Sequence, residues 1–413
     1  MKNIRFLLCL LVVVCASMLV FTACGQGADT TAETPAVTTT ATTTTVATTT
    51  SIDYSEKTLT PAAAIAEDQL KVYGRYVELE GEAISCDFTA CGIEFSAYCR
   101  GDVAVEIQVQ QPVTGQGATF GFFTIWVDGE RMDVELRKDS GRPTAYTSGV
   151  RVVRTATVNL ATGLEEGLHT FKILKQNNPR NCIAQINWIK LEGEMAARPA
   201  DRDVLIEFIG DSLTAAYGNL GTNGVSTDNG SANIEDGTLS YAYLAAEQLG
   251  ADWSIIARPG IGVIFGTDAN EFQMSNIYKL QCFWRSKTVL YEPAERKPQL
   301  VVMYLGTNDN SKVGQSTANK ELFDEKYRSL IDEVIANYGE DVEILLLENK
   351  ALSATTKGVI ASIKGDYEQV KVLPFTRHTS GAGSHASVAE CQTEANELEA
   401  AIRTLYPELF PAK

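Results

Sequence analysis

A serine follows the first long apolar run in the second half of the chain. Residues 206–217 read IEFIGDSLTAAY, so the apolar run breaks at Gly210 and is followed by Asp211 and Ser212. A serine hydroxyl is a poor nucleophile unless a base takes its proton, and the oxyanion that it creates needs hydrogen-bond donors. Ser212 is therefore a candidate nucleophile, for which the chain should supply a base and such donors.

Two further glycine-bearing loops follow apolar runs. The first is ARPGIG at 257–262, with Gly260, and the second is GTND at 306–309, with Asn308 and Asp309. In an open parallel sheet the ligand crevice lies beyond the carboxyl ends of the strands. We therefore expect a hydroxyl, backbone amides and a side-chain amide to converge at one edge of a sheet.

Residues 203–413 alternate buried strands with amphipathic helices. The near-continuous apolar runs are typical of a parallel sheet that is covered on both faces, and they occupy 204–209, 253–257, 300–305, 343–347 and 370–375. Helical stretches include 241–249 and 321–338. A last helix follows Ser387 and Glu390, which have the spacing of a capping box. This pattern predicts an α/β/α domain with a five-stranded parallel sheet.

Residues 55–200 have a different texture of short strands and turns. Asp128-Gly129 separates two strand-like segments, which is a strong hairpin signal. Other strand-like segments are 103–110, 151–158 and 169–174. No long helical period intervenes, so this part predicts an all-β sandwich domain.

The first 24 residues predict an export signal. Lys2 and Arg5 precede an apolar run at 6–21, and small residues lead to Cys24 in a sequence that resembles a bacterial lipobox. We expect lipid attachment at Cys24 and an extracellular, membrane-anchored protein, with a plain secretory signal or an uncleaved anchor as alternatives. Residues 25–54 are rich in Thr and predict a disordered linker.

The composition excludes several functions. With 35 basic against 52 acidic residues the chain has a net charge of −17, which argues against a nucleic-acid partner. Only three histidines occur, so we expect no metal site and no cofactor. Once the signal is removed and Cys24 is modified, six cysteines are left, which permits disulfides without specifying how they pair. The oligomeric state is not indicated.

The ordered blocks GDSL (210–213), the Gly260 loop, GTND and a late histidine resemble the SGNH or GDSL hydrolases. The preceding part, with WVDGE (126–130) and GLHTFKILKQ (167–176), looks like the jelly-roll domain of carbohydrate esterase family 2. This resemblance implies Ser212 and His385 as catalytic residues. It also implies Ser212 N–H, Gly260 N–H and the Asn308 amide as the oxyanion hole.

The chain departs from that pattern beside His385. Where the family places an aspartate three residues before the histidine, this chain has Ala382, within GAGSHAS at 381–387. Some members of the family use a main-chain carbonyl there, so we expect a dyad of Ser212 and His385. An aspartate installed by Ala382→Asp is expected to raise turnover or to leave it unchanged.

The resemblance implies a surface-anchored esterase that removes O-acetyl groups from plant polysaccharides such as acetylated xylan or glucomannan. Two alternatives are a lipase or lysophospholipase built on the same layer, and a non-catalytic carbohydrate-binding lipoprotein whose hydrolase layer has decayed. The missing aspartate favours the last alternative, whereas the presence of Ser212, Asn308 and His385 argues against it.

The signal leads to a first prediction. If the lipobox is used, the mature protein begins at Cys24 and carries lipid on that residue, because the charged start, the apolar run and the small residues are all present. Mass spectrometry of the amino-terminal peptide from membranes checks this. A free, unmodified terminus elsewhere would contradict it.

Overall fold

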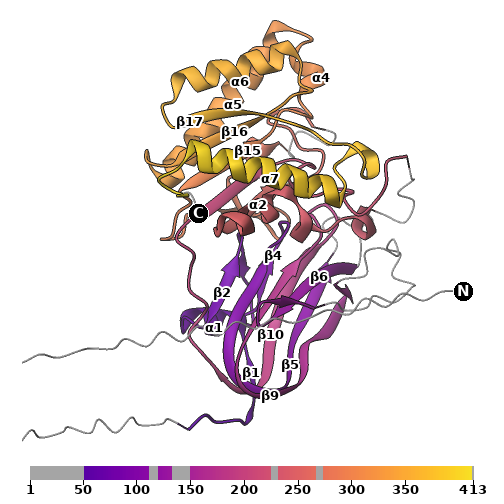
Figure 1. Cartoon of the computed structure of the whole chain (residues 1–413), viewed down its shortest axis with the longest axis vertical. Coiled ribbons are helices and arrows are strands. Elements are labelled where there is room, and N and C mark those ends of the chain that lie inside the picture. Colours follow the sequence, from indigo (N-terminus) through magenta and orange to yellow (C-terminus); the bar gives the residue numbers. More distant parts are fainter. Residues whose placement is uncertain (1–50, 111–119, 133–148, 225–230, 267–272, 412–413) are drawn as a thin grey trace, which may run out of the picture. The chain divides into compact units, whose positions relative to one another are not determined.

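The computed structural model describes residues 51–110, 120–132, 149–224, 231–266 and 273–411 (Figure 1). The predicted signal and lipidation site, and the linker up to residue 50, lie outside them. Residues 51–413 form one compact unit. Within the described ranges, no helix is both long and apolar enough to cross a membrane.

An antiparallel β domain makes up the first part of this unit. Its sheet has the order β3-β4-β10-β5-β9-β6-β7, with β1, β2 and β8 paired beside this path, and it is accompanied by helix α1 (Pro61–Ala66). The strands are β1 (Glu56–Leu59), β2 (Leu70–Tyr73), β3 (Val77–Glu78), β4 (Ile84–Cys86), β5 (Gly92–Gln110), β6 (Phe120–Val127), β7 (Glu130–Arg131), β8 (Val150–Val153), β9 (Thr155–Lys175) and β10 (Ile183–Met195).

The predicted hairpin and strands are found with altered lengths. Asp128 and Gly129 join β6 to β7 with φ angles of 51° and 81°, as a tight hairpin turn requires. The strand expected at 151–158 is broken at Arg154, whose φ is 55°, between β8 and β9. β5 and β9 are far longer than expected because register shifts between Cys99 and Ala104 let the pair bend without ending.

The second part is the predicted parallel layer. Its five strands lie in the order β12-β11-β15-β16-β17, and every neighbouring pair is parallel. They are β11 (Leu205–Gly210), β12 (Asp252–Ala257), β15 (Leu300–Tyr304), β16 (Glu343–Asn349) and β17 (Val370–Phe375). The fold class predicted from the sequence, a β domain followed by this α/β layer, is confirmed.

Helices cover both faces of this sheet (Figure 1). One face packs on α2 (Tyr241–Leu249) and α7 (Val388–Leu405), and the other on α3 (Met274–Ile277), α4 (Asn310–Val313), α5 (Thr317–Tyr338) and α6 (Ala354–Asp366). Successive residues of a strand point to opposite faces of the sheet, so Phe208 packs in the core on the first face and Ile209 in the core on the second. Both faces therefore need apolar residues, which explains the unbroken apolar runs.

Shorter elements connect these layers. They are the 3-10 turns η2 (Ser231–Ile234), η3 (Gly237–Leu239) and η5 (Ala382–Ser384), and a hairpin of β13 (Leu280–Cys282) and β14 (Ser286–Leu290). The predicted capping box of α7 is confirmed, because the side chain of Ser387 accepts from Glu390 N–H and the Glu390 carboxylate accepts from Ser387 N–H. This cap fixes where the helix begins, three residues after His385.

Buried ion pairs join the β domain to the parallel layer. Arg75, in the segment after β2, donates to Glu207 of β11 at 3.3 Å, and both side chains are at most 2% exposed. Lys71 of β2 donates to both oxygens of Asp252, each at 2.9 Å. A buried charge without its partner is costly, so removing one member of either pair should destabilise the folded protein.

Of the cysteines in the described residues, Cys86 and Cys91 form a disulfide. The other four, Cys99, Cys182, Cys282 and Cys391, are buried free thiols. Six cysteines could form three disulfides, but only one pair is bonded in the described residues.

The Arg75 pair leads to a stability prediction. Arg75→Met should lower the free energy of unfolding by about 3–5 kcal/mol, because Glu207 would stay buried without a cation. Urea denaturation measures this. Adding Glu207→Gln to Arg75→Met should recover part of the loss, and equal stability of wild type and Arg75→Met would show that the pair contributes nothing.

Candidate active site

Three loops meet at the carboxyl edge of the parallel sheet. Ser212 follows β11, Gly260 follows β12 and Asn308 follows β15, and these strands are neighbours in the sheet. Asn308 joins the other two loops, since its side-chain amide donates to Asp211 at 3.0 Å and to the carbonyl of Ile261 at 2.7 Å. The convergence expected from the sequence is therefore present.

The structure places His385 against Ser212. Nε2 of His385 lies 2.7 Å from Oγ of Ser212, which is hydrogen-bonding distance. Ser212 is only 9% exposed, and His385 is partly buried between η5 and the start of α7. A base in this position can take the proton of the serine hydroxyl.

A main-chain carbonyl faces the other ring nitrogen. Nδ1 of His385 lies 3.2 Å from the carbonyl oxygen of Ala382, which also accepts from the backbone N–H of His385 at 3.3 Å. In the described part of the chain, no carboxylate is hydrogen-bonded to this imidazole. The acceptor is thus of the kind expected from the GAGS run, and a neutral Nδ1–H tautomer leaves Nε2 free to accept from Ser212.

A close approach of two backbone segments holds that carbonyl in place. The N–H of Ala382 donates to the carbonyl of Gly218 at 2.9 Å. Gly218 has a φ of 74°, and a Cβ there would lie 2.6 Å from the Ala382 oxygen. Only glycine fits this position without moving the acceptor of His385.

The donors expected in the oxyanion hole differ in the hydrogen bonds that they already make. Within the described residues, the N–H of Ser212 has no protein acceptor. The Asn308 amide is different, because both of its hydrogens already have acceptors in Asp211 and Ile261. A substrate carbonyl would therefore have to compete with the Ile261 carbonyl for Asn308. Gly260 has a φ of 78°, as its tight loop requires, and its role stays a prediction.

Two buried carboxylates brace these loops. Asp309 accepts from the N–H groups of Val263, Ile264 and Phe265 at 2.8–3.0 Å, which fixes the loop that carries Gly260. Asp211 accepts from Leu213 N–H at 2.9 Å. Burial raises the pKa of Asp309 and raises that of Asp211 to about 7, although the N–H groups oppose both shifts.

Burial lowers the pKa of His385. The hydrogen bond to Ala382 opposes this shift, whereas the charge of Arg377 adds to it. Since the ring must be neutral to act as a base, it keeps that capacity below the usual pH range of a histidine.

The other two histidines have separate partners. Nδ1 of His378 lies 3.1 Å from Glu394 on α7, a carboxylate that is 3% exposed. Burial raises the pKa of Glu394 to about 7, against the effect of the His378 hydrogen bonds. In the β domain, Nδ1 of His169 lies 2.8 Å from Asp128. His378 is thus tied to the last helix rather than to Ser212.

Some residues of the site escaped the sequence analysis. The ring of Tyr217 lies 4.9 Å from that of His385, and Arg377 donates to the carbonyl of Ser384. Neither residue belongs to a recognisable motif, although a glycine such as Gly218 soon after a nucleophile is a hint of close packing.

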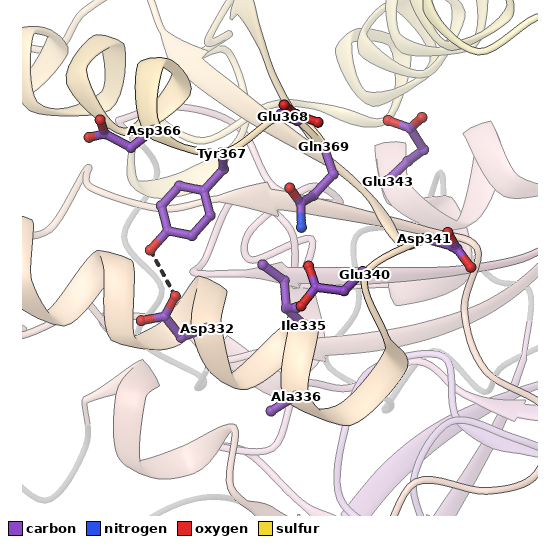
Figure 2. Close-up of a pocket in the computed structure, with 10 residues that line it drawn as sticks. All are labelled: Asp332, Ile335, Ala336, Glu340, Asp341, Glu343, Asp366, Tyr367, Glu368 and Gln369. Atoms are coloured by element: carbon purple, nitrogen blue, oxygen red, sulfur yellow. Dashed lines mark hydrogen bonds between the residues drawn. The ribbon is translucent and has the colours of Figure 1, made fainter.

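A hollow lies elsewhere in the parallel layer (Figure 2). Its volume is about 890 Å³, and six carboxylates line it together with Tyr367, whose hydroxyl donates to Asp332. It includes Glu343, the first residue of β16, so it lies at the amino ends of the strands. Ser212 is at the opposite edge, and none of the predicted site residues lines this hollow.

Residues 206–412 match the family described as GDSL-like Lipase/Acylhydrolase. The match spans half of the chain, so the chain belongs to this family. The resemblance that was drawn from the blocks at 210–213 and 306–309 is therefore confirmed.

Two curated relatives are also similar. One is "Cellulase/esterase CelE" of Acetivibrio thermocellus, 31% identical over 268 residues, which cover 60% of this chain and 31% of that protein. The other is "Acetylxylan esterase / glucomannan deacetylase" of Cellvibrio japonicus, 27% identical over 205 residues, which cover 47% of this chain and 57% of that protein. The chain thus spans about a third to just over half the length of these relatives.

A solved structure resembles both parts of the chain. It is a family two carbohydrate esterase from Clostridium thermocellum in complex with cellohexaose, with 25% identity and a TM-score of 0.67. The similarity covers 81% of this chain and 98% of that one. The β domain and the parallel layer therefore occur together in that esterase.

The surroundings of Ala382 change the outcome expected for Ala382→Asp. Its side chain is 1% exposed and packs on Gly221, where an added Cβ would lie 2.6 Å away. A carboxylate there would be buried, and we now expect the free energy of unfolding to fall by about 2 kcal/mol or more, without a gain in turnover. Thermal unfolding together with ester hydrolysis measures this, and a stable, faster variant would contradict it.

Proposed function

We propose that this protein is a serine esterase that removes acetyl groups from O-acetylated plant polysaccharides. The observation that carries the proposal is the 2.7 Å contact between His385 Nε2 and Ser212 Oγ, at an edge where N–H donors also gather. Membership of an acylhydrolase family supports the reaction class. An acetylxylan esterase and a cellohexaose-binding esterase among the similar proteins support a glycan substrate.

The first step follows from the two hydrogen bonds of His385. The proton of Ser212 Oγ passes to Nε2 as Oγ bonds to the acetyl carbon, and the carbonyl oxygen becomes negative. The Ser212 and Gly260 N–H groups stabilise this oxyanion, and Asn308 joins them when it turns from Ile261. The C–O bond to the sugar then breaks, and the sugar oxygen takes the proton from His385.

Water completes the reaction in the same way. His385 takes a proton from water as it attacks the acetyl group on Ser212, and acetate leaves as Ser212 regains its proton. The Ala382 carbonyl keeps Nδ1 protonated throughout. Being neutral, it stabilises the imidazolium less than a carboxylate would.

We also propose that the protein acts at the cell surface, attached by lipid at Cys24. This rests on the sequence of the first 24 residues alone. A polymeric substrate outside the cell is consistent with it, and the Thr-rich linker would give the unit at 51–413 reach from a membrane.

Ser212→Ala and His385→Ala should each lower kcat on acetylated xylan by about 10⁴-fold or more, because they remove the nucleophile or the base. His378→Ala is the matched control and should retain most of the turnover, since His378 contacts Glu394 instead. Acetate release by purified protein measures this, with thermal unfolding to check folding.

Three results would contradict the proposal. Release of long-chain fatty acid but no acetate would favour a lipase. Glycan binding without release of any acyl group would favour a decayed hydrolase layer. A larger loss for His378→Ala than for His385→Ala would reassign the base.

A further inference from the structure

Arg377 lies beside the proposed catalytic base and has no assigned task. It follows β17, eight residues before His385, and its Nη2 donates to the carbonyl of Ser384 at 2.9 Å. Its Nε is buried and, within the described residues, has no hydrogen-bond partner. The charge of Arg377 also opposes the rise that burial causes in the pKa of Asp211, so Arg377 acts both on the loop after β11 and on the segment before α7.

The carbonyl that Arg377 holds belongs to a strained turn. Gly383 and Ser384 have φ angles of 61° and 60°, two consecutive left-handed residues of which the second is not glycine. Such a conformation persists only when the surroundings fix it. This turn is what brings the Ala382 carbonyl back to Nδ1 of His385.

Other contacts hold the two ends of this turn. Ala382 N–H donates to the Gly218 carbonyl, and Gly381 N–H donates to the His385 carbonyl at 2.7 Å. Ser384 lies between these points, and its side chain makes only a long contact of 3.4 Å with Asn223. Of these two hydrogen bonds to Ser384, the one from Arg377 is charged and, at 2.9 Å, the shorter, so it restrains the left-handed serine more than Asn223 does.

We propose that Arg377 is a positioning residue for His385, which clamps the Ser384 carbonyl so that the Ala382–Ser384 turn presents its main-chain acceptor to Nδ1. The inference rests on the proposed esterase function. It gives Arg377 an indirect part in orienting His385, by restraining the turn whose Ala382 carbonyl faces Nδ1.

The charge of Arg377 has a second effect. It lowers the pKa of His385, in addition to the larger effect of burial, whereas an aspartate would raise it. The ring of Tyr217 packs against the imidazole. Burial raises the pKa of Asp211, beside Ser212, and the same Arg377 charge opposes that rise, whereas Glu390 of α7 is bonded to Ser380 and Ser387. Removing the Arg377 charge should therefore raise the pKa of the base.

Arg377→Met and Arg377→Lys test the two effects separately. In Arg377→Met, kcat for acetate release should fall about 10- to 100-fold, since the imidazole loses its orientation. The acid limb of the kcat/KM profile should also move to higher pH. Arg377→Lys keeps the charge but loses the planar guanidinium with its fixed donors, so kcat should fall while the acid limb stays in place. Lys357→Met on α6, which removes a donor to the Lys350 carbonyl rather than to the Ser384 turn, is the control and should alter neither quantity.

NMR of the histidine side chains provides a readout without turnover. His169→Gln and His378→Gln assign the signals, and His385 should be the Nδ1–H tautomer in wild type and lose this preference in Arg377→Met. Wild-type kcat in Arg377→Met, or a loss of kcat with an unchanged tautomer and pH profile, would overturn the inference. If wild type releases no acetate, the proposed function fails, whereas the tautomer and the imidazole titration still test the clamp.

Discussion

One hydrogen bond determines whether this site can work, namely that between Nδ1 of His385 and the carbonyl of Ala382. A neutral imidazole carries one proton, and only when it is on Nδ1 can Nε2 accept from Ser212. Much of the nearby structure supports that choice. The capping box sets the start of α7, Gly218 leaves space for the carbonyl, and the left-handed residues 383 and 384 turn the chain back on itself.

A neutral acceptor also suits the electrostatics of this edge of the sheet. Asp211 and Asp309 are already buried beside Ser212 and Asn308, and burial raises the pKa of each. Another buried carboxylate would need donors of its own, and the nearby N–H groups of the 263–265 loop are used by Asp309. A carbonyl sets the tautomer without adding charge, at the cost of weaker support for the imidazolium.

Much of this architecture was predictable from the sequence. The five parallel strands were found because a sheet covered on both faces needs unbroken apolar runs, and the start of α7 was found because Ser387 and Glu390 have capping-box spacing. The lengths of β5 and β9 were not, because bulges let a strand continue where local patterns suggest an end. Local sequence patterns therefore predict the ends of strands least well where the chain bends.

The chemistry of the site was only partly predictable. The contact between Ser212 and His385 was anticipated from the resemblance, and the absence of an aspartate at 382 was visible directly. The partners of Asn308 were not, because they depend on where the Asp211 and Ile261 loops meet in space. Arg377 had no signal, since its contact is with a main-chain oxygen that any residue at 384 would provide.

The buried contact of Arg75 with Glu207 constrains how recombination can separate the two domains during evolution. The family match begins at residue 206, yet a strand inside it keeps a buried anion whose cation comes from the β domain. A recombination event that moved the matched segment alone would carry the anion away from its cation. The two parts should therefore descend as a pair, and the natural boundary for exchanging modules lies ahead of the β domain rather than at the edge of the matched segment.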